Sequence, residues 1–146
     1  SKPRNKYDEL FRQASQCANN KIDESLICVK QNIFESTRAN IFVRYGNTIV
    51  TPKLNNSILN GVFRQAITAE FEHDILTLTQ DNISLTSLIN ADEIILVNAL
   101  RGASLIKTID SVIFPELSKY TPKEPVLKKY LDALYKKNIK TFNEGE

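Results

Sequence analysis

The chain has 146 residues, of which 42% are hydrophobic and 25% charged, and its formal net charge is +2. This composition is typical of a soluble globular domain, and so small a charge argues against a nucleic-acid groove or a membrane surface. No apolar run approaches the roughly 20 residues that span a bilayer, and Cys17 and Cys28 suit neither a disulfide framework nor a metal site. We therefore expect one cytoplasmic domain without a metal, and with neither nucleic acid nor membrane as a partner.

The order of apolar runs and turn residues predicts strands alternating with helices. Short apolar runs between turn residues indicate strands, and apolar residues spaced by three and four indicate helices. In chain order we predict a helix over residues 5–19, strands over 26–29 and 33–34 with a turn at 31–32, strands over 41–43 and 48–50 with a turn at 45–47, a helix after Gly61 as far as Phe71, a strand over 75–79, a helical turn over 85–89 and a strand over 93–98. This pattern indicates a mixed α/β domain.

The last segment carries a helix start signal. Thr121 is a suitable N-cap, with Pro122 at the first helical position and Glu124 completing a capping box. The apolar stripe of this helix begins at Val126. Residues 111–146 are therefore predicted to form a C-terminal helical extension within the same domain.

Taken one at a time, the candidate functional residues are weak signals. Lys2 is one of many lysines, Glu35 follows an apolar strand, and Gly61 before a helix can be a turn residue. His73 is the only histidine and has no partners at metal-ligand spacing, so a surface or core role suits it better. The chain has no G-x-S-x-G, P-loop or dinucleotide-binding motif.

Short motifs in a fixed order give a stronger signal than any single residue. The motifs are Lys2 with Asn5, Glu35 with Asn40-Ile41-Phe42, Thr51-Pro52-Lys53-Leu54 with Ile58-Leu59-Asn60-Gly61-Val62-Phe63-Arg64, and Ala91-Asp92-Glu93-Ile94-Ile95 with Asn98-Ala99-Leu100-Arg101-Gly102. In this order, and with 33 positions between Lys2 and Glu35, they resemble the class IV pyridoxal-phosphate-dependent aminotransferase family of fold type IV. The resemblance extends from residue 2 to about residue 106.

The resemblance implies a fold and a domain organisation. Residues 1–146 would form the C-terminal, cofactor-binding domain of an enzyme like D-amino-acid aminotransferase, with a mixed sheet or pseudo-barrel and flanking helices. In that family a small N-terminal domain supplies the phosphate-binding arginine and half of the substrate pocket, and a partner subunit closes the site. We therefore expect Ser1 to be a cut end, with the first domain outside this chain, and the whole protein to be a homodimer.

The resemblance also implies pyridoxal 5'-phosphate as the cofactor and assigns roles to residues. Lys2 is implied as the catalytic residue, since an amine on a long arm is needed to bond the cofactor aldehyde. Glu35 is implied beside the pyridine nitrogen, whose pKa a carboxylate raises. Asn40 and Tyr7 are further implied cofactor contacts, although a core position on the first helix is an equally good interpretation of Tyr7.

Two segments are implied to bind the anionic groups. Gly61, Val62 and Phe63 open a helix, where backbone N–H groups and the helix dipole favour a phosphate. By resemblance, Asn98 and Ala99 supply further backbone donors for the cofactor, and Ala99 and Leu100 do so for the substrate carboxylate.

Within the family, residues 98–102 and 60–65 look most like those of 4-amino-4-deoxychorismate lyase. Branched-chain aminotransferases carry a Gly-Thr-Ala loop, and Ala99 stands where their threonine would be. We therefore predict a lyase that converts 4-amino-4-deoxychorismate to 4-aminobenzoate, a folate precursor, and pyruvate, with Lys2 as general base and acid. Two alternatives remain. One is a class IV aminotransferase acting on branched-chain or D-amino acids, toward which Tyr7 points, and the other is a degenerate, non-catalytic interaction domain.

Overall fold

The computed structural model describes residues 26–29, 32–36, 39–55, 58, 60–109, 111 and 114–145, and within 26–36 and 144–145 it describes the backbone only. The helix predicted over residues 5–19 lies outside this part of the chain, as do Lys2 and Tyr7. None of the described helices is long and apolar enough to cross a membrane.

The described elements alternate between strands and helices, and this confirms the predicted mixed α/β class. They are β1 (Leu26–Val29), β2 (Asn32–Ser36), β3 (Asn40–Tyr45), β4 (Thr48–Thr51), α2 (Val62–Glu70), β5 (Thr77–Gln80), β6 (Ile83–Ser84), the 3-10 helix η1 (Thr86–Asn90), β7 (Glu93–Asn98), β8 (Gly102–Leu105), the 3-10 helix η2 (Pro115–Lys119) and α3 (Val126–Gly145). Both predicted antiparallel strand pairs are present, although Asn32, which was predicted to lie in a turn, belongs to β2. The strand predicted over 75–79 begins two residues later, and β6 and β8 were not predicted.

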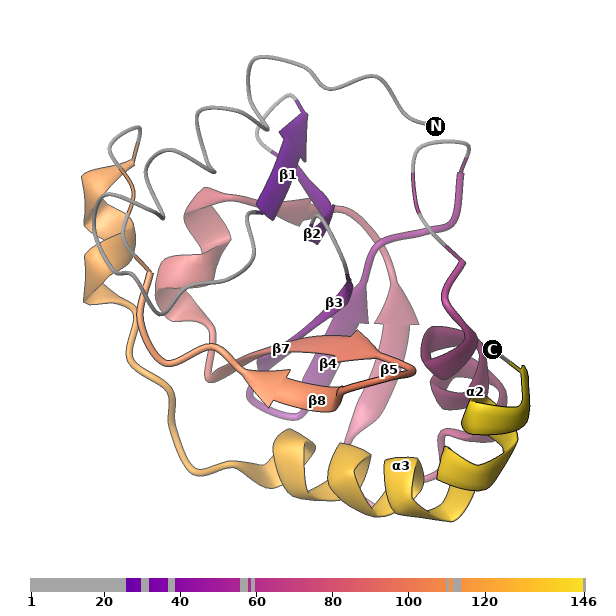
Figure 1. The fold of residues 1–146 in the computed structure, drawn as a ribbon. Coiled ribbons are helices and arrows are strands. Elements are labelled where there is room, and N and C mark those ends of the chain that lie inside the picture. Colours follow the sequence, from indigo (N-terminus) through magenta and orange to yellow (C-terminus); the bar gives the residue numbers. More distant parts are fainter. Residues whose placement is uncertain are drawn as a thin grey trace.

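The described strands form one mixed sheet. β1 to β5 follow one another in the order β1-β2-β3-β4-β5, with β4 and β5 parallel and the other pairs antiparallel (Figure 1). β7 pairs with β3 on one side and with β8 on the other. The centre of the sheet is therefore the β3–β7 pair, which brings residue 40 opposite residue 97.

The central pair is buried on both faces, which explains why its strands are continuous apolar runs. Side chains alternate along a strand, so Ile41 and Val43 belong to one apolar cluster while Phe42 belongs to the other. The first cluster is covered by η1 and η2, and the second by α2 and α3 (Figure 1).

Helix α3 does not begin where the sequence predicted. It starts at Val126 rather than at Pro122, so Thr121 and Glu124 form no capping box. Its N-terminus is capped from the sheet instead, because the Glu93 carboxylate of β7 accepts hydrogen bonds from Leu127 N at 2.7 Å and Lys128 N at 2.8 Å. A carboxylate at this position satisfies N–H groups that have no partner within the helix and complements the helix dipole.

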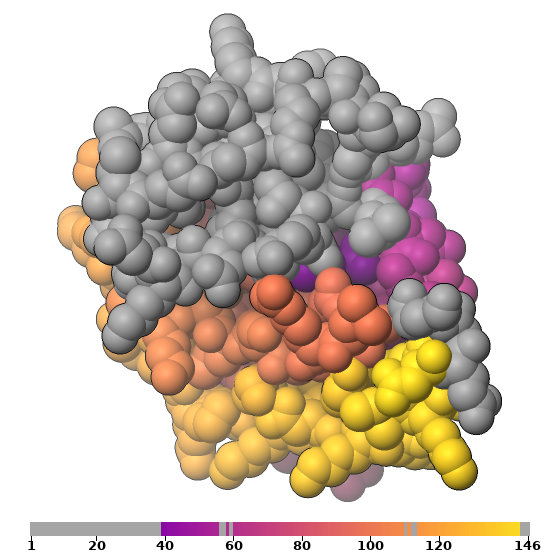
Figure 2. Space-filling view, in the orientation of Figure 1, coloured from indigo at the N-terminus to yellow at the C-terminus, as the bar shows by residue number. Residues whose placement is uncertain are grey.

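Glu93 is fully buried and is also paired with a cation. The Arg44 Nε of β3 donates to the same carboxylate, and Arg44 Nη2 donates to the Glu124 carbonyl at 3.0 Å. This ion pair joins the neighbouring strands β3 and β7 to the start of α3. As a result, α3 runs along the β7–β8 hairpin, as the yellow and orange atoms of Figure 2 show.

Candidate functional site

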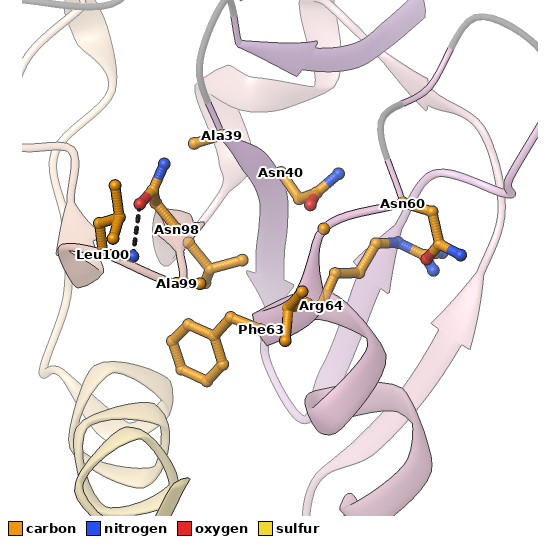
Figure 3. Close-up of a pocket in the computed structure, with 11 residues that line it drawn as sticks. Ala39, Asn40, Asn60, Phe63, Arg64, Asn98, Ala99 and Leu100 are labelled. Carbon is orange, nitrogen blue, oxygen red and sulfur yellow. Dashed lines mark hydrogen bonds between the residues drawn. The ribbon is translucent and has the colours of Figure 1, made fainter. Parts of the chain in front are cut away.

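A pocket of about 330 Å³ lies where the start of β3, the end of β7 and the start of α2 meet. This volume falls at the lower end of the roughly 300–1,000 Å³ typical of small-molecule sites. The described residues that line the pocket are Ala39, Asn40, Asn60, Gly61, Val62, Phe63, Arg64, Val97, Asn98, Ala99 and Leu100 (Figure 3). The structure thus brings together seven residues that the sequence proposed for the site from three separate segments: Asn40, Gly61, Val62, Phe63, Asn98, Ala99 and Leu100.

The side chain of Asn40 approaches Gly61 closely. A Cβ atom on Gly61 would lie 2.5 Å from Asn40 Oδ1, well inside van der Waals contact. The backbone of Gly61 is extended, with φ −65° and ψ 150°, which other residues also adopt. Space, rather than backbone conformation, therefore explains the glycine, and the missing side chain leaves the backbone open to the pocket.

The N-terminus of α2 faces the pocket without a side-chain cap. Gly61 is the N-cap residue and has no side chain with which to cap the first amides, and the first turn contains no acidic residue. The first four N–H groups of a helix have no partner within the helix, and together with the dipole they favour an anion. A bound phosphate or carboxylate would supply the missing acceptor.

Arg64 places a buried positive charge at the same helix start. Its side chain is 2% exposed, Nη2 donates to the Pro52 carbonyl at 2.9 Å and to Gln80 Oε1 at 3.3 Å, and Nε has no partner in the described part of the chain. Burial lowers the pKa of the Arg64 guanidinium from its ordinary value, although arginine stays charged in proteins. Because Arg64 is the only charged residue among the described lining residues, the pocket favours anions.

The loop after β7 is held in a tight turn by Asn98. Asn98 Oδ1 accepts hydrogen bonds from Leu100 N at 2.7 Å and from Arg101 N at 3.3 Å. Figure 3 shows the first of these bonds, with both residues on the side of the pocket opposite Arg64. Two amides of the loop, those of Leu100 and Arg101, are therefore bonded within the loop itself.

Phe63 can contact a ligand only through its backbone. Its ring is 1% exposed and points away from Asn40 and Asn98, toward α3 (Figure 3). There it packs against the rings of Tyr135 and Phe142, at centroid distances of 5.1 and 5.4 Å. Of the cofactor contact that the sequence suggested for Phe63, only the backbone amide is available.

The side chains of Lys2, Tyr7 and Glu35 lie outside what the structure describes. Lys2 and Tyr7 lie outside the described residues. The backbone of Glu35 in β2 pairs with that of Asn40 in β3. Because Asn40 lines the pocket, the main chain of Glu35 is one strand away from it.

Four lining residues were not proposed from the sequence: Ala39, Asn60, Val97 and Arg64. Ala39 and Val97 flank proposed residues and have no signal of their own. Asn60 and Arg64 belong to a motif that was recognised, but no role was assigned to them. Arg64 did carry a signal, because a cation in the first turn of a helix opposes the helix dipole and needs a tertiary explanation.

These residues suit the phosphate of pyridoxal 5'-phosphate better than they suit a metal. The uncapped helix start, the space at Gly61 and the buried guanidinium all favour an anion. Among the described residues, no group of three His, Cys, Asp or Glu side chains could hold a metal ion.

Sequence comparisons with known proteins find similar aminotransferases and a similar lyase. Branched-chain-amino-acid aminotransferase 6 of Arabidopsis thaliana is 32% identical over 106 residues, which make up 71% of this chain and 29% of that protein. Aminodeoxychorismate lyase of Vibrio harveyi is 24% identical over 110 residues, or 75% of this chain and 41% of that protein. The chain thus spans less than half the length of these relatives.

Solved structures share the fold. An aminotransferase of Brucella abortus bound to the cofactor PLP matches with a TM-score of 0.69 and 20% identity, over 88% of this chain and 42% of that one. 4-Amino-4-deoxychorismate lyase of Pseudomonas aeruginosa also matches with a TM-score of 0.69 and 20% identity, over 84% and 43%. At this identity the likeness concerns the fold, and it confirms the fold class that the sequence predicted.

The sequence itself identifies the family. A family model described as amino-transferase class IV matches residues 2–109, which is most of the chain and nearly the segment over which the motifs were recognised. The chain therefore belongs to the class IV aminotransferases, the pyridoxal-phosphate enzyme family that its motifs predicted.

Proposed function

We propose that this chain forms the cofactor-binding part of a pyridoxal-phosphate lyase that converts 4-amino-4-deoxychorismate to 4-aminobenzoate and pyruvate. The observation that carries the cofactor assignment is the convergence of seven predicted residues on one pocket beside the uncapped start of α2. When bound there, pyridoxal phosphate supplies an electron-withdrawing ring and a carbonyl group. The chain's own residues bind it, orient it and move protons.

The phosphate is assigned to the start of α2. The amides of Val62 and Phe63 donate to it, and the absence of a side chain on Gly61 lets it approach the backbone. The buried charge of Arg64 adds an attraction that solvent screens only weakly. In the family a second arginine comes from the N-terminal domain, so we expect the affinity of the whole protein to exceed that of this chain.

Lys2 and Glu35 carry the chemistry in this proposal. Lys2 Nζ holds the cofactor and then moves a proton as general base and acid. The Glu35 carboxylate keeps the pyridine nitrogen protonated by raising its pKa. Neither function is needed for packing, so retention of both residues argues against a degenerate interaction domain.

The choice of a lyase rests on the loop after β7. Ala99 has no hydroxyl, so at this position only its N–H can bind an anion, whereas branched-chain aminotransferases use a threonine. Leu100 is 68% exposed and lines the pocket, which gives an apolar surface beside the loop. This surface suits the carbon ring of 4-amino-4-deoxychorismate.

Colour and covalent labelling test the cofactor assignment. The purified whole protein should be yellow, and borohydride should couple the cofactor irreversibly to the chain. A Lys2→Ala variant should lose the labelling, and peptide mapping should find the label on Lys2 in the wild type. Protein that remains colourless and takes up no added pyridoxal phosphate would favour an interaction domain.

A class IV aminotransferase is the second candidate, favoured by the 32% identity to the Arabidopsis branched-chain aminotransferase. The two reactions give different products, so one pair of assays separates them. A lyase forms 4-aminobenzoate from 4-amino-4-deoxychorismate, whereas an aminotransferase passes an amino group from a branched-chain or D-amino acid to 2-oxoglutarate. Transfer without 4-aminobenzoate formation would refute the lyase. A homodimer in the cytoplasm completes the proposal, and sedimentation analysis of the whole protein tests the dimer.

A further inference from the structure

One hydroxyl group of helix α3 forms a hydrogen bond with the loop after β7. Tyr135 Oη donates a hydrogen bond to the Ala99 carbonyl at 2.8 Å, across 36 positions of the chain. Tyr135 lies beyond residues 2–109, which the family model matches, and it belongs to none of the family motifs. Its partner Ala99 lines the pocket.

The hydroxyl completes the fixation of one peptide group. The Ala99 carbonyl and the Leu100 N–H belong to the same planar peptide. Tyr135 Oη donates to the carbonyl end at 2.8 Å, and Asn98 Oδ1 accepts from the N–H end at 2.7 Å. With both ends bonded, this peptide cannot rotate without breaking a hydrogen bond, and this restrains the adjoining backbone of Ala99.

The ring of Tyr135 lies against Gly102 and Phe63. Gly102 has φ +85°, and a Cβ atom there would lie 3.0 Å from Tyr135 Cδ2. The ring also packs against Phe63, in the first turn of α2. Tyr135 therefore touches both parts of the pocket wall that bind anions in the proposed function, namely the start of α2 and the loop after β7.

We propose that Tyr135 is a positioning residue that sets the affinity of the pocket for pyridoxal 5'-phosphate. It acts through the Ala99–Leu100 peptide, whose fixation restrains the adjoining Ala99 N–H, and through Phe63. The effect on the cofactor rests on the proposed function, whereas the effect on the loop does not. The C-terminal helix thus contributes to the site as well as to the core.

The chain offers a matched control on the same helix. Tyr130 Oη accepts a hydrogen bond from Glu72 N at 3.0 Å, beyond the C-terminal end of α2 and away from the lining residues. Tyr135→Phe and Tyr130→Phe each remove one hydroxyl and keep the ring. The unfolding temperatures of both variants should lie within a few degrees of that of the wild type. A difference between them in loop exchange or cofactor affinity then comes from where the lost hydroxyl lies, not from a general loss of stability.

Two measurements on the whole protein test the inference. In the apoprotein, Tyr135→Phe should speed hydrogen exchange of the Leu100 and Arg101 amides several-fold, and Tyr130→Phe should leave it unchanged. In a titration with pyridoxal 5'-phosphate, Tyr135→Phe should raise the dissociation constant about 2- to 12-fold, which is the equivalent of one lost hydrogen bond of about 0.5–1.5 kcal/mol. Tyr130→Phe should stay within about twofold of the wild type.

The outcomes separate the two proposals. Unchanged loop exchange in Tyr135→Phe overturns the positioning role, whether or not the protein binds cofactor. Faster exchange with unchanged affinity shows that the loop moves without consequence for the ligand, which also overturns the inference as stated. A wild-type protein that binds no pyridoxal phosphate refutes the proposed function and the predicted effect of Tyr135 on affinity. In that case the hydrogen-exchange measurement alone decides whether Tyr135 fixes the loop.

Discussion

The buried carboxylate that caps α3 gives the largest predicted change in stability. In Glu93→Gln an amide replaces a carboxylate that accepts from Arg44 Nε, Leu127 N and Lys128 N. The amide keeps one acceptor oxygen, presents an N–H₂ group where an acceptor is needed, and leaves the buried Arg44 without its full counter-charge. Breaking a buried ion pair by removing one partner costs about 3–5 kcal/mol, a large part of the roughly 5–15 kcal/mol that stabilises a typical domain.

Urea unfolding followed by circular dichroism measures this effect, with the midpoint falling while the denaturant dependence stays the same. Asp132→Asn is the control, because its carboxylate also pairs with Lys128 but is 45% exposed. A surface pair at this helical spacing is worth only about 0.3–0.5 kcal/mol. If Glu93→Gln lost less than about 1 kcal/mol, or no more than Asp132→Asn, α3 would not depend on this cap and the account of its start would be wrong.

Three further predictions concern the pocket, the pH dependence and the core. Gly61→Ala places a carbon 2.5 Å from Asn40 Oδ1, so titration with pyridoxal phosphate should show an affinity at least about tenfold weaker, equivalent to about 1.4 kcal/mol. The control is Gly46→Ala in the β3–β4 turn, where φ is +61° and a Cβ atom would have nothing within 4 Å. This variant should lower the free energy of unfolding by about 1–2 kcal/mol and leave the affinity unchanged. Burial raises the pKa of Tyr120 from 10.0 to about 12, so the contribution of the neutral hydroxyl to the free energy of unfolding should be complete below pH 10 and should fall by about 2–3 kcal/mol as the pH rises to 12. Urea midpoints between pH 9 and 12 measure this fall, and an equally steep fall in Tyr120→Phe would disprove it. Leu131→Ala, at a fully buried position between α3 and the sheet, should cost about 2–5 kcal/mol in the same unfolding assay, and a loss below 1 kcal/mol would mean that this helix face is not part of the core.

Local patterns predicted most of the described elements. The turn at residues 45–47, the stop before Pro52 and the strand over 93–98 all follow from residue types within a few positions of each other, and all are present. β6 and β8 escaped prediction because they are short and their residues take strand geometry only when paired with β2 and β7. Strand propensity depends strongly on such neighbours.

The start of α3 shows the limit of local reasoning. A capping box at Thr121 was a good local signal, but the structure caps the helix with Glu93, 34 positions away from Leu127 in the chain. The free energy of satisfying a buried carboxylate and its arginine exceeds that of a capping box at the surface. A distant partner of this kind cannot be read from a window of neighbouring residues.

The sequence by itself determined the family and the proposed residues, because the motifs record residue types that the chemistry requires at fixed intervals. Only the tertiary structure could decide that three of those segments share a pocket, that Arg64 is a buried charge in its wall, and that Tyr135 holds its loop. Each of these contacts joins residues from different elements, and their energy arises from burial and hydrogen bonding across the fold rather than from any local preference.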